Sequence, residues 1–315
     1  MSASSELEST LQRLEAFGVR LGLDTTRRLL TALGEPQRSL RPVLVAGTNG
    51  KGSTAVLLAS MATAAGYRVG LYTSPHLESV EERLRLGGRA IDTETLTTIL
   101  TEVVATAESR LGYLPTYFEA LTASAFVWFA RQAVDLAVFE VGLGGRLDAT
   151  NGCEPVLSLI TEIGLEHQKY LGDTLARIGR EKAGILRAER PAIVWVERPE
   201  ARTAIEEVGV EVGARLMWAH SSVDIEARED RGWDGQRIEL TTPRGRHELE
   251  LPLLGEHQVA NLALATLAAE ELAASGLPRL DGRAIAAGTA MTRWPGRLEW
   301  VRPQETKPVL LDVAH

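Results

Sequence analysis

The sequence predicts an α/β fold: a mostly parallel sheet with helices on both faces and a small antiparallel edge. Short continuous apolar segments, typical of strands buried on both faces, alternate with longer segments of helical pattern. Residues 223–252 instead alternate apolar with polar side chains around two glycine-containing turns, which indicates an antiparallel excursion at the sheet edge. With 315 residues, the chain is long enough for one large domain or two ordinary ones.

The elements follow one another in a regular order. Helical patterns at 7–17 and 25–33 precede a first strand at 42–46. A helix to about residue 65, ended by Gly66, and a strand at 68–73 complete a strand–helix–strand unit. The remaining expected helices span 93–111, 116–132, 174–186, 258–274 and 281–291, and the remaining expected strands span 136–141, 156–161, 192–196 and 309–313.

Composition and charge exclude several classes of protein. The chain has 34 basic and 42 acidic residues, so its net charge of −8 gives no general attraction for nucleic acid or anionic membranes. Its one cysteine, Cys153, rules out an internal disulfide, and the polar N-terminus lacks the pattern of a secretion signal. The apolar segments are too short or too interrupted to span a bilayer. We therefore expect a cytoplasmic protein without nucleic-acid or membrane partners.

A glycine-rich loop lies between the strand at 42–46 and the following helix. Backbone N–H groups in such a turn, together with the helix N-terminus, bind phosphate. Lys51 adds a positive charge, and a hydroxyl at the start of the helix can bind a metal ion. The spacing departs from the usual P-loop, yet the context still predicts a P-loop-type nucleotide site. The loop residues are Gly47, Thr48, Asn49, Gly50, Lys51, Gly52, Ser53 and Thr54.

Glu140 lies in the apolar strand predicted at 136–141. Burying a lone carboxylate costs several kcal/mol, so a cation has to accompany it. A magnesium ion on the bound nucleotide would serve, because ligands bind at the carboxyl ends of parallel strands. An ion pair with a base such as Arg146 is the alternative.

Two further residues carry weaker signals. His167 follows the strand at 156–161 and could be a metal ligand in its neutral form, although a single histidine is more often a surface residue. Lys182 lies in a predicted helix beside Glu181, and this pattern alone indicates a solvated ion pair. Neither residue identifies a site by itself.

Six stretches of the sequence carry a family resemblance. They read GTNGKGS, YTSPHL with ERLRLGG, EVGLGGRLDATN, ITEIGLEHQKYLGDTLARIGREKAGI, LLGEHQVANLALA and RWPGRLEW. Together, and in this order, they resemble the folylpolyglutamate and dihydrofolate synthases, which belong to the Mur ligase superfamily. The resemblance runs from the first helices to the last residue.

The resemblance implies an ATP-dependent ligase that adds L-glutamate to a folate-type carboxylate, with dihydropteroate, tetrahydrofolate or both as acceptor. The reaction would pass through an acyl phosphate. ATP and two Mg²⁺ ions are the implied cofactors, and a monomer is the implied state. The small-molecule substrates would be ATP, L-glutamate and the folate or dihydropteroate acceptor.

The resemblance also implies roles for individual residues. ATP phosphates would be held by Gly50, Lys51 and Ser53, with further ATP contacts from Asn261, Arg297 and Asp312. The first magnesium ion would be bound by Ser53, Ser74 and Glu140, and the second by His167 and a carbamylated Lys182. His315 would act beside the glutamate and the phosphate as a catalytic residue together with Lys51 and Lys182. The folate pocket would include Phe118, Asp148 and Ala149.

The same resemblance divides the chain into an ATP-binding domain at 1–294 and a linker with one strand at 295–315. That strand would begin a Rossmann-like glutamate-ligase domain, of which only the start is present. The expectation is therefore a truncated chain that binds ATP weakly or not at all and does not catalyse ligation. Three alternatives stay open: an amino-acid ligase for cell-wall precursors, a P-loop NTPase without ligase activity, and a non-catalytic relic.

Overall fold

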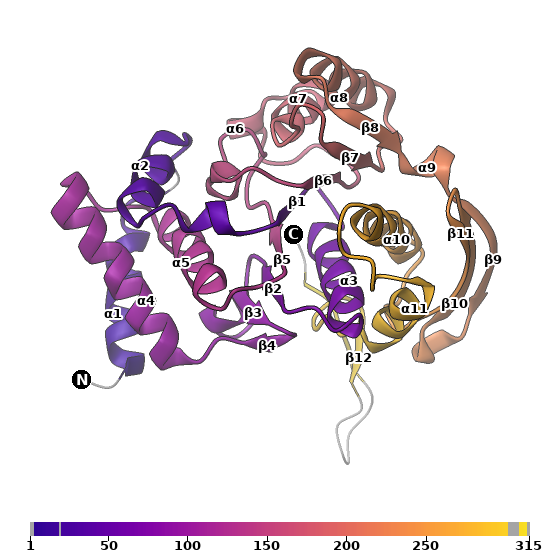
Figure 1. Ribbon diagram of the computed structural model, residues 1–315, viewed down its shortest axis with the longest axis horizontal. Coiled ribbons are helices and arrows are strands. Elements are labelled where there is room, and N and C mark those ends of the chain that lie inside the picture. The colour runs from indigo at the N-terminus through magenta and orange to yellow at the C-terminus, as the bar shows by residue number, and fades with distance from the viewer. Residues whose placement is uncertain (1–2, 19, 302–308, 314–315) are drawn as a thin grey trace.

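The computed structural model describes residues 3–18, 20–301 and 309–313. Its main sheet has eight strands in the order β4-β3-β2-β5-β1-β6-β7-β8 (Figure 1). The mutually parallel strands are β1 (Pro42–Ala46), β2 (Val69–Tyr72), β5 (Leu136–Glu140), β6 (Leu157–Ile160), β7 (Pro191–Val194) and β8 (Arg215–Trp218). Two short strands, β3 (Leu84–Leu86) and β4 (Arg89–Ala90), pair antiparallel at one edge. The predicted α/β class is confirmed.

Helices cover both faces of this sheet, and alternate residues of the central strand β1 belong to two different cores. Leu44 and Ala46 belong to a core with α1, α2, α4, α5, α7 and α8, whereas Val43 and Val45 belong to a core with α3, α10 and α11. The first group comprises α1 (Ala3–Glu15), α2 (Asp24–Ala32), α4 (Thr93–Thr106), α5 (Tyr117–Arg131), α7 (Leu175–Ala183) and α8 (Pro199–Val212). The second group comprises α3 (Lys51–Ala64), α10 (His257–Ala274) and α11 (Gly282–Met291), and the short helices are α6 (Gln168–Leu171) and α9 (Ala219–Ser222).

A second, three-stranded sheet is formed by β9 (Asp224–Asp230), β10 (Gln236–Thr242) and β11 (Gly245–Leu251). The antiparallel strands predicted at 223–252 are therefore present, but they do not extend the edge of the main sheet. Their buried side chains, Ile238 and Leu240 among them, pack in the core of α3, α10 and α11, beyond which the sheet lies in Figure 1. The main sheet obtains its antiparallel edge from β3 and β4 instead.

The last two described strands, β12 (Glu299–Val301) and β13 (Val309–Leu311), pair antiparallel with each other. The strand predicted at 309–313 is thus present over three residues, and the division of the chain at residue 294 stays a prediction. His315 lies outside the described residues. Within the described part of the chain, no helix is long and apolar enough to cross a membrane.

Candidate active site

A cavity of about 1280 Å³ opens at the carboxyl ends of the parallel strands. Its lining includes Thr48, Ser74 and Thr161, which lie within two residues of the ends of β1, β2 and β6, together with Glu140 at the end of β5. This edge is where open α/β sheets bind ligands. The predicted site residues that line the cavity are Thr48, Asn49, Gly50, Lys51, Gly52, Ser53, Ser74, Phe118, Glu140, Asp148, Ala149, His167, Asn261, Arg297 and Asp312. Gly47, Thr54 and Lys182 are not part of this lining.

The glycine loop is held close to its neighbours. Gly47 and Gly50 both have positive φ, at 147° and 84°. A Cβ atom on Gly47 would lie 1.7 Å from the Thr161 hydroxyl oxygen, and one on Gly50 would lie 2.2 Å from Asn261 Oδ1. Only glycine satisfies both the backbone conformation and the space at these positions. Lys51 begins α3 and its ammonium donates to the Thr48 carbonyl at 2.8 Å, so the charge lies at the loop.

The Glu140 carboxylate is buried, and its Oε2 accepts a hydrogen bond from the Ser74 N–H at 3.0 Å. Burial raises the pKa of Glu140, while the Lys51 ammonium is the main opposing influence. The alternative ion pair with Arg146 is wrong, because Arg146 pairs with Glu181 at 2.8 Å. Glu140 thus has a buried carboxylate facing a cavity, and no ion pair of it with a base is seen among the described residues.

This donor set fits magnesium bound together with a nucleotide. The described residues contain no group of three or more His, Cys, Asp or Glu side chains that could hold a metal alone. Mg²⁺ commonly uses one or two carboxylates and completes its shell with water and substrate phosphate oxygens. Glu140 and the Ser53 hydroxyl beside the glycine loop supply that kind of partial shell.

Lys182 is buried, with 1% of its side chain exposed, and does not form the solvated pair with Glu181 that its sequence neighbours indicated. Its ammonium donates to the Gly47 carbonyl at 2.6 Å and forms an ion pair with Glu166. The pKa of Lys182 is lowered to about 8, chiefly by burial and also by the nearby Lys51, while Glu166 opposes the shift. The lysine therefore fastens the glycine loop to α7.

Glu166 lines the cavity and was not identified from the sequence. It directly precedes the exposed His167, which has a left-handed backbone (φ 43°) and begins α6. Burial of Glu166 by itself raises its pKa, but Lys182 and Lys51 together lower the pKa below the ordinary value. Its position next to a predicted metal ligand is the one sequence signal that could have identified it.

Phe118, Asp148 and Ala149, the predicted folate residues, also line the cavity. The Phe118 ring packs so tightly on Gly142 that a Cβ there would lie 2.5 Å from Cζ. The Asp148 carboxylate accepts from the N–H groups of Leu143 and Thr150, at 2.8 and 2.9 Å, so it fixes its own loop. The Phe118 ring and the loop fixed by Asp148 therefore form an apolar and a rigid part of the cavity wall.

Arg83 also lines this cavity and was not identified from the sequence. Its guanidinium donates to His76 Nδ1 at 2.9 Å and lies 5.2 Å from the centre of the Tyr117 ring. These contacts place a positive charge at the cavity wall, which suits an anionic substrate.

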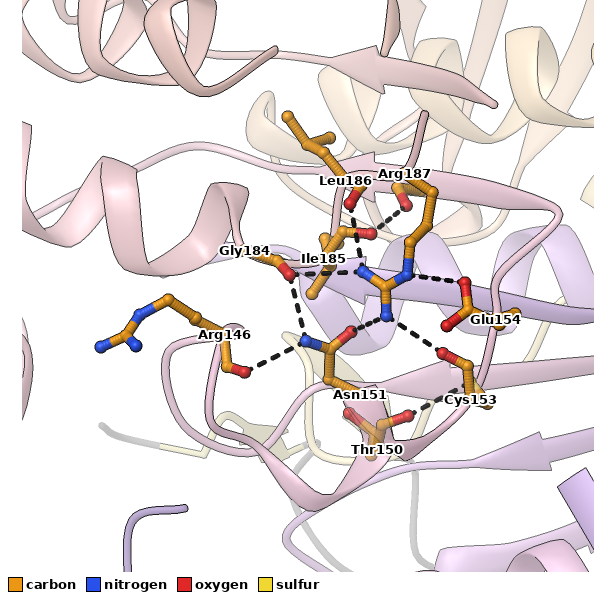
Figure 2. A network of polar contacts seen from close by, with 10 residues as sticks. Arg146, Thr150, Asn151, Cys153, Glu154, Gly184, Ile185, Leu186 and Arg187 are labelled. Carbon is orange, nitrogen blue, oxygen red and sulfur yellow. Dashed lines mark hydrogen bonds and ion pairs between the residues drawn. The ribbon is translucent and has the colours of Figure 1, made fainter. Parts of the chain in front are cut away.

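Figure 2 shows the network that joins the Asp148 loop to the end of α7. The Asn151 amide nitrogen donates to the carbonyls of Arg146 and Gly184, at 3.2 and 3.0 Å. Arg187 donates to Asn151 Oδ1 at 2.8 Å and to the Cys153 carbonyl at 3.0 Å. Because α7 carries Lys182, this network connects the Asp148 loop to the helix that bears Lys182.

Replacing Asn151 by alanine should lower the free energy of unfolding by about 2 kcal/mol, because two carbonyls and the Arg187 guanidinium lose their partner. Urea unfolding measures the change. Glu154→Gln is the control: its carboxylate also binds Arg187 but is 83% exposed, so the change should stay within about 0.5 kcal/mol. Equal effects of the two substitutions would contradict the structural role of Asn151.

The comparisons with known proteins agree with this geometry. Residues 45–269 match the family model of the Mur ligase middle domain. Over 305 residues, the chain is 39% identical to the dihydrofolate synthase/folylpolyglutamate synthase of Bacillus subtilis, covering 95% of this chain and 70% of that protein. The chain belongs to the folylpolyglutamate and dihydrofolate synthases of the Mur ligase family. The predicted family is confirmed.

Solved structures of this synthase family share the fold over the whole chain. One, an FPGS-AMPPCP-folate complex, has a TM-score of 0.90 and 33% identity, covering 100% of this chain and 77% of that one. Another, FolC of Escherichia coli in complex with DHPP and ADP, has a TM-score of 0.84 and 36% identity, with 100% and 71% covered. The synthases in these complexes bind an adenine nucleotide together with folate or DHPP. The roles of single residues in this chain stay predictions.

Proposed function

We propose that this synthase binds ATP and a folate-type acceptor in the described cavity and joins L-glutamate to the acceptor carboxylate, in place of the weak or absent ATP binding and missing ligation expected above for a truncated chain. One observation carries the proposal: the glycine loop and the predicted folate residues Phe118, Asp148 and Ala149 line the same cavity of about 1280 Å³. The terminal phosphate of ATP and a substrate carboxylate can therefore meet inside it. The FPGS-AMPPCP-folate complex supports the same pair of ligands.

The chemistry follows from the residues. A carboxylate is a poor electrophile, so the γ-phosphoryl group of ATP is transferred to it and ADP leaves. The amine of glutamate then attacks the acyl phosphate, the amide bond forms and phosphate departs. Lys51 and the N-terminus of α3 stabilise the negative charge on the phosphoryl oxygens. An acyl phosphate hydrolyses readily, so the site has to exclude water until glutamate arrives.

Magnesium, when bound, neutralises charge on the phosphates. We assign Ser53, Ser74 and Glu140 to the first ion, and His167 with a carbamylated Lys182 to the second. Lys182 is paired with Glu166 in the structure, and a carbamate would repel that carboxylate. Carbamylation therefore requires this ion pair to open.

Three further residues are assigned to ATP: Asn261, Arg297 and Asp312. Asn261 lies against Gly50, and its amide nitrogen donates to Gln258 Oε1 at 2.8 Å, which fixes its orientation beside the loop. Arg297 and Asp312 flank the two strands β12 and β13 and line the same cavity. The catalytic role of His315 falls outside the described residues.

Carbamylation of Lys182 should increase as pH rises through about 8. Burial disfavours the ammonium, so the neutral amine that reacts with carbon dioxide prevails above this pKa and is scarce below it. In ¹³C-bicarbonate, a carbamate carbonyl signal should be visible by NMR and should strengthen across this pH range. Lys182→Arg should abolish the signal and Lys169→Arg should keep it. A signal that survives Lys182→Arg would contradict the assignment.

Acceptor dependence tests the function. With ATP, Mg²⁺ and L-glutamate present, phosphate release should be stimulated by dihydropteroate or tetrahydrofolate and not by a peptide-accepting cell-wall precursor. Stimulation by the cell-wall precursor alone would favour the other ligase class. Equal release without any acceptor would favour a P-loop NTPase.

We also propose that the enzyme acts as a monomer, as its resemblance to the synthases implies. Its one cysteine, Cys153, is buried and free, and a free thiol is compatible with the reducing cytoplasm. Sedimentation at several protein concentrations tests the monomer: a mass that rises with concentration would contradict it.

A further inference from the structure

Two indole rings join parts of the chain that are far apart in the sequence. Trp233 lies in a short 3-10 turn, η5 (Gly232–Asp234), between β9 and β10, and Trp300 lies in β12. The rings stack with their centres 3.8 Å apart and their planes 9° apart. Trp233 is 51% exposed, so filling the core does not explain it. The stack connects the three-stranded sheet to the β12–β13 pair.

The β12–β13 pair carries residues of the cavity. Arg297 precedes β12, and Asp312 and Val313 follow β13; all three line the cavity. The Leu298 N–H donates to Asp312 Oδ1 at 3.2 Å, and the Val313 N–H donates to the Gly296 carbonyl at 2.9 Å. These bonds fix Arg297 and Asp312 relative to each other. Among the described strands, β12 and β13 pair only with each other, so no strand pairing fixes them relative to the glycine loop.

The turn that bears Trp233 is, in contrast, tied to the helices of the ATP site. Ile238 and Leu240 of β10 are fully buried in the core that α3 and α10 share. Gln236, at the start of β10, donates to the carbonyls of Leu253 and Gly255 at 2.9 and 3.0 Å, immediately before α10. The glycine loop leads into α3, and α10 carries Asn261. Trp233 therefore belongs to a sheet that is fixed relative to the ATP site.

We propose that the Trp233–Trp300 stack is a latch that fixes the β12–β13 pair over the ATP site, so that Trp233 is a positioning residue for Arg297 and Asp312. This inference rests on the proposed function, because that function assigns the two residues to ATP. Trp233 itself is not part of the cavity lining and acts through Trp300. Leu298 also approaches Gly255, and Gly296 approaches Leu77, so the latch is one of several attachments and its loss should weaken ATP binding without abolishing it.

Hydrogen exchange tests the latch without any nucleotide. In Trp233→Ala, the Leu298 and Val313 amides should exchange faster than in the wild type, and the far-ultraviolet circular dichroism couplet of stacked indoles should disappear. Ile225→Ala is the control, because this residue lies exposed on β9 of the same small sheet. Unchanged exchange in Trp233→Ala, with the couplet lost, would overturn the latch.

Ligand binding tests its consequence. Trp233→Ala and Trp300→Ala should each weaken AMPPCP binding roughly three- to tenfold, and the double variant should be no weaker than either. Trp233→Phe, which keeps an aromatic ring, should restore most of the affinity. The affinity for dihydropteroate should not change, because a positioning defect affects only the binding of the nucleotide. A loss of overall folding would instead weaken the binding of both ligands.

The two failures are distinguishable. If the wild type does not bind AMPPCP, the proposed function is contradicted. The hydrogen-exchange measurement would still show whether the indole stack fixes the β12–β13 pair. If the wild type binds AMPPCP and Trp233→Ala binds it equally tightly, the latch is overturned and the proposed function is not. The same holds if the losses of affinity in the two single variants add up in the double variant.

Discussion

Lys51→Ala is expected to weaken AMPPCP binding roughly a hundredfold, as isothermal titration measures it in the presence of Mg²⁺. The ammonium at the start of α3 is the charge of the glycine loop, and it lies beside Glu140 in the cavity lining. Its removal leaves the phosphates without a charge-assisted hydrogen bond at the glycine loop.

The control for this experiment is Lys169→Ala. Lys169 is exposed on α6, lies over the Tyr170 ring and is not part of the cavity lining, so its loss should leave AMPPCP affinity within about twofold. Dihydropteroate binding should survive both substitutions. If Lys51→Ala binds AMPPCP like the control, the glycine loop is not the phosphate site.

Gly47→Ala is expected to lower the free energy of unfolding by about 3 kcal/mol and to abolish detectable AMPPCP binding. The new Cβ would lie 1.7 Å from the Thr161 hydroxyl and 3.1 Å from the Thr161 backbone nitrogen, so a rotamer change cannot clear it. The loop would have to move away from β6, and with it the carbonyl that binds Lys182. Urea unfolding and titration with AMPPCP measure the two effects.

Gly22→Ala separates the two causes of this loss. Gly22 has φ of 144°, almost the value of Gly47, but a Cβ there would meet no atom within 4 Å. The control therefore carries the backbone strain without the collision, and we expect about 1 kcal/mol of destabilisation. A Gly47→Ala effect no larger than that of Gly22→Ala would contradict the packing of the loop on Thr161.

The sequence predicts the buried part of the fold well for a physical reason. Strands β1, β5 and β6 are covered on both faces, so each is a continuous apolar segment whose bounds are visible locally. The edge strands β4 and β8 and the strand β3 beside β4 were not predicted. β3 and β4 have three and two residues, and β8 is only half-buried, so none of them shows a periodic pattern. Their pairing depends on partners that are distant in the sequence.

The same distinction applies to the site. Residues that share one short motif, such as Lys51 and Ser53, were identified together because the chemistry is local. Glu166 and Arg83 were missed, since a charged residue beside a motif is usually solvated. Lys182 was assigned a solvated environment for the same reason, although α7 buries it against the Gly47 carbonyl. Burial of this kind arises from tertiary packing and leaves no local pattern.

The central claim is that one cavity holds ATP and a folate-type acceptor at the same time. Titration of dihydropteroate into the protein, first alone and then saturated with Mg²⁺-AMPPCP, tests it most directly. We expect one acceptor bound per chain in both titrations, with Phe118→Ala weakening dihydropteroate binding and Lys51→Ala weakening only AMPPCP binding. Failure of dihydropteroate to bind, or its displacement by AMPPCP, would show that one cavity does not hold both ligands together.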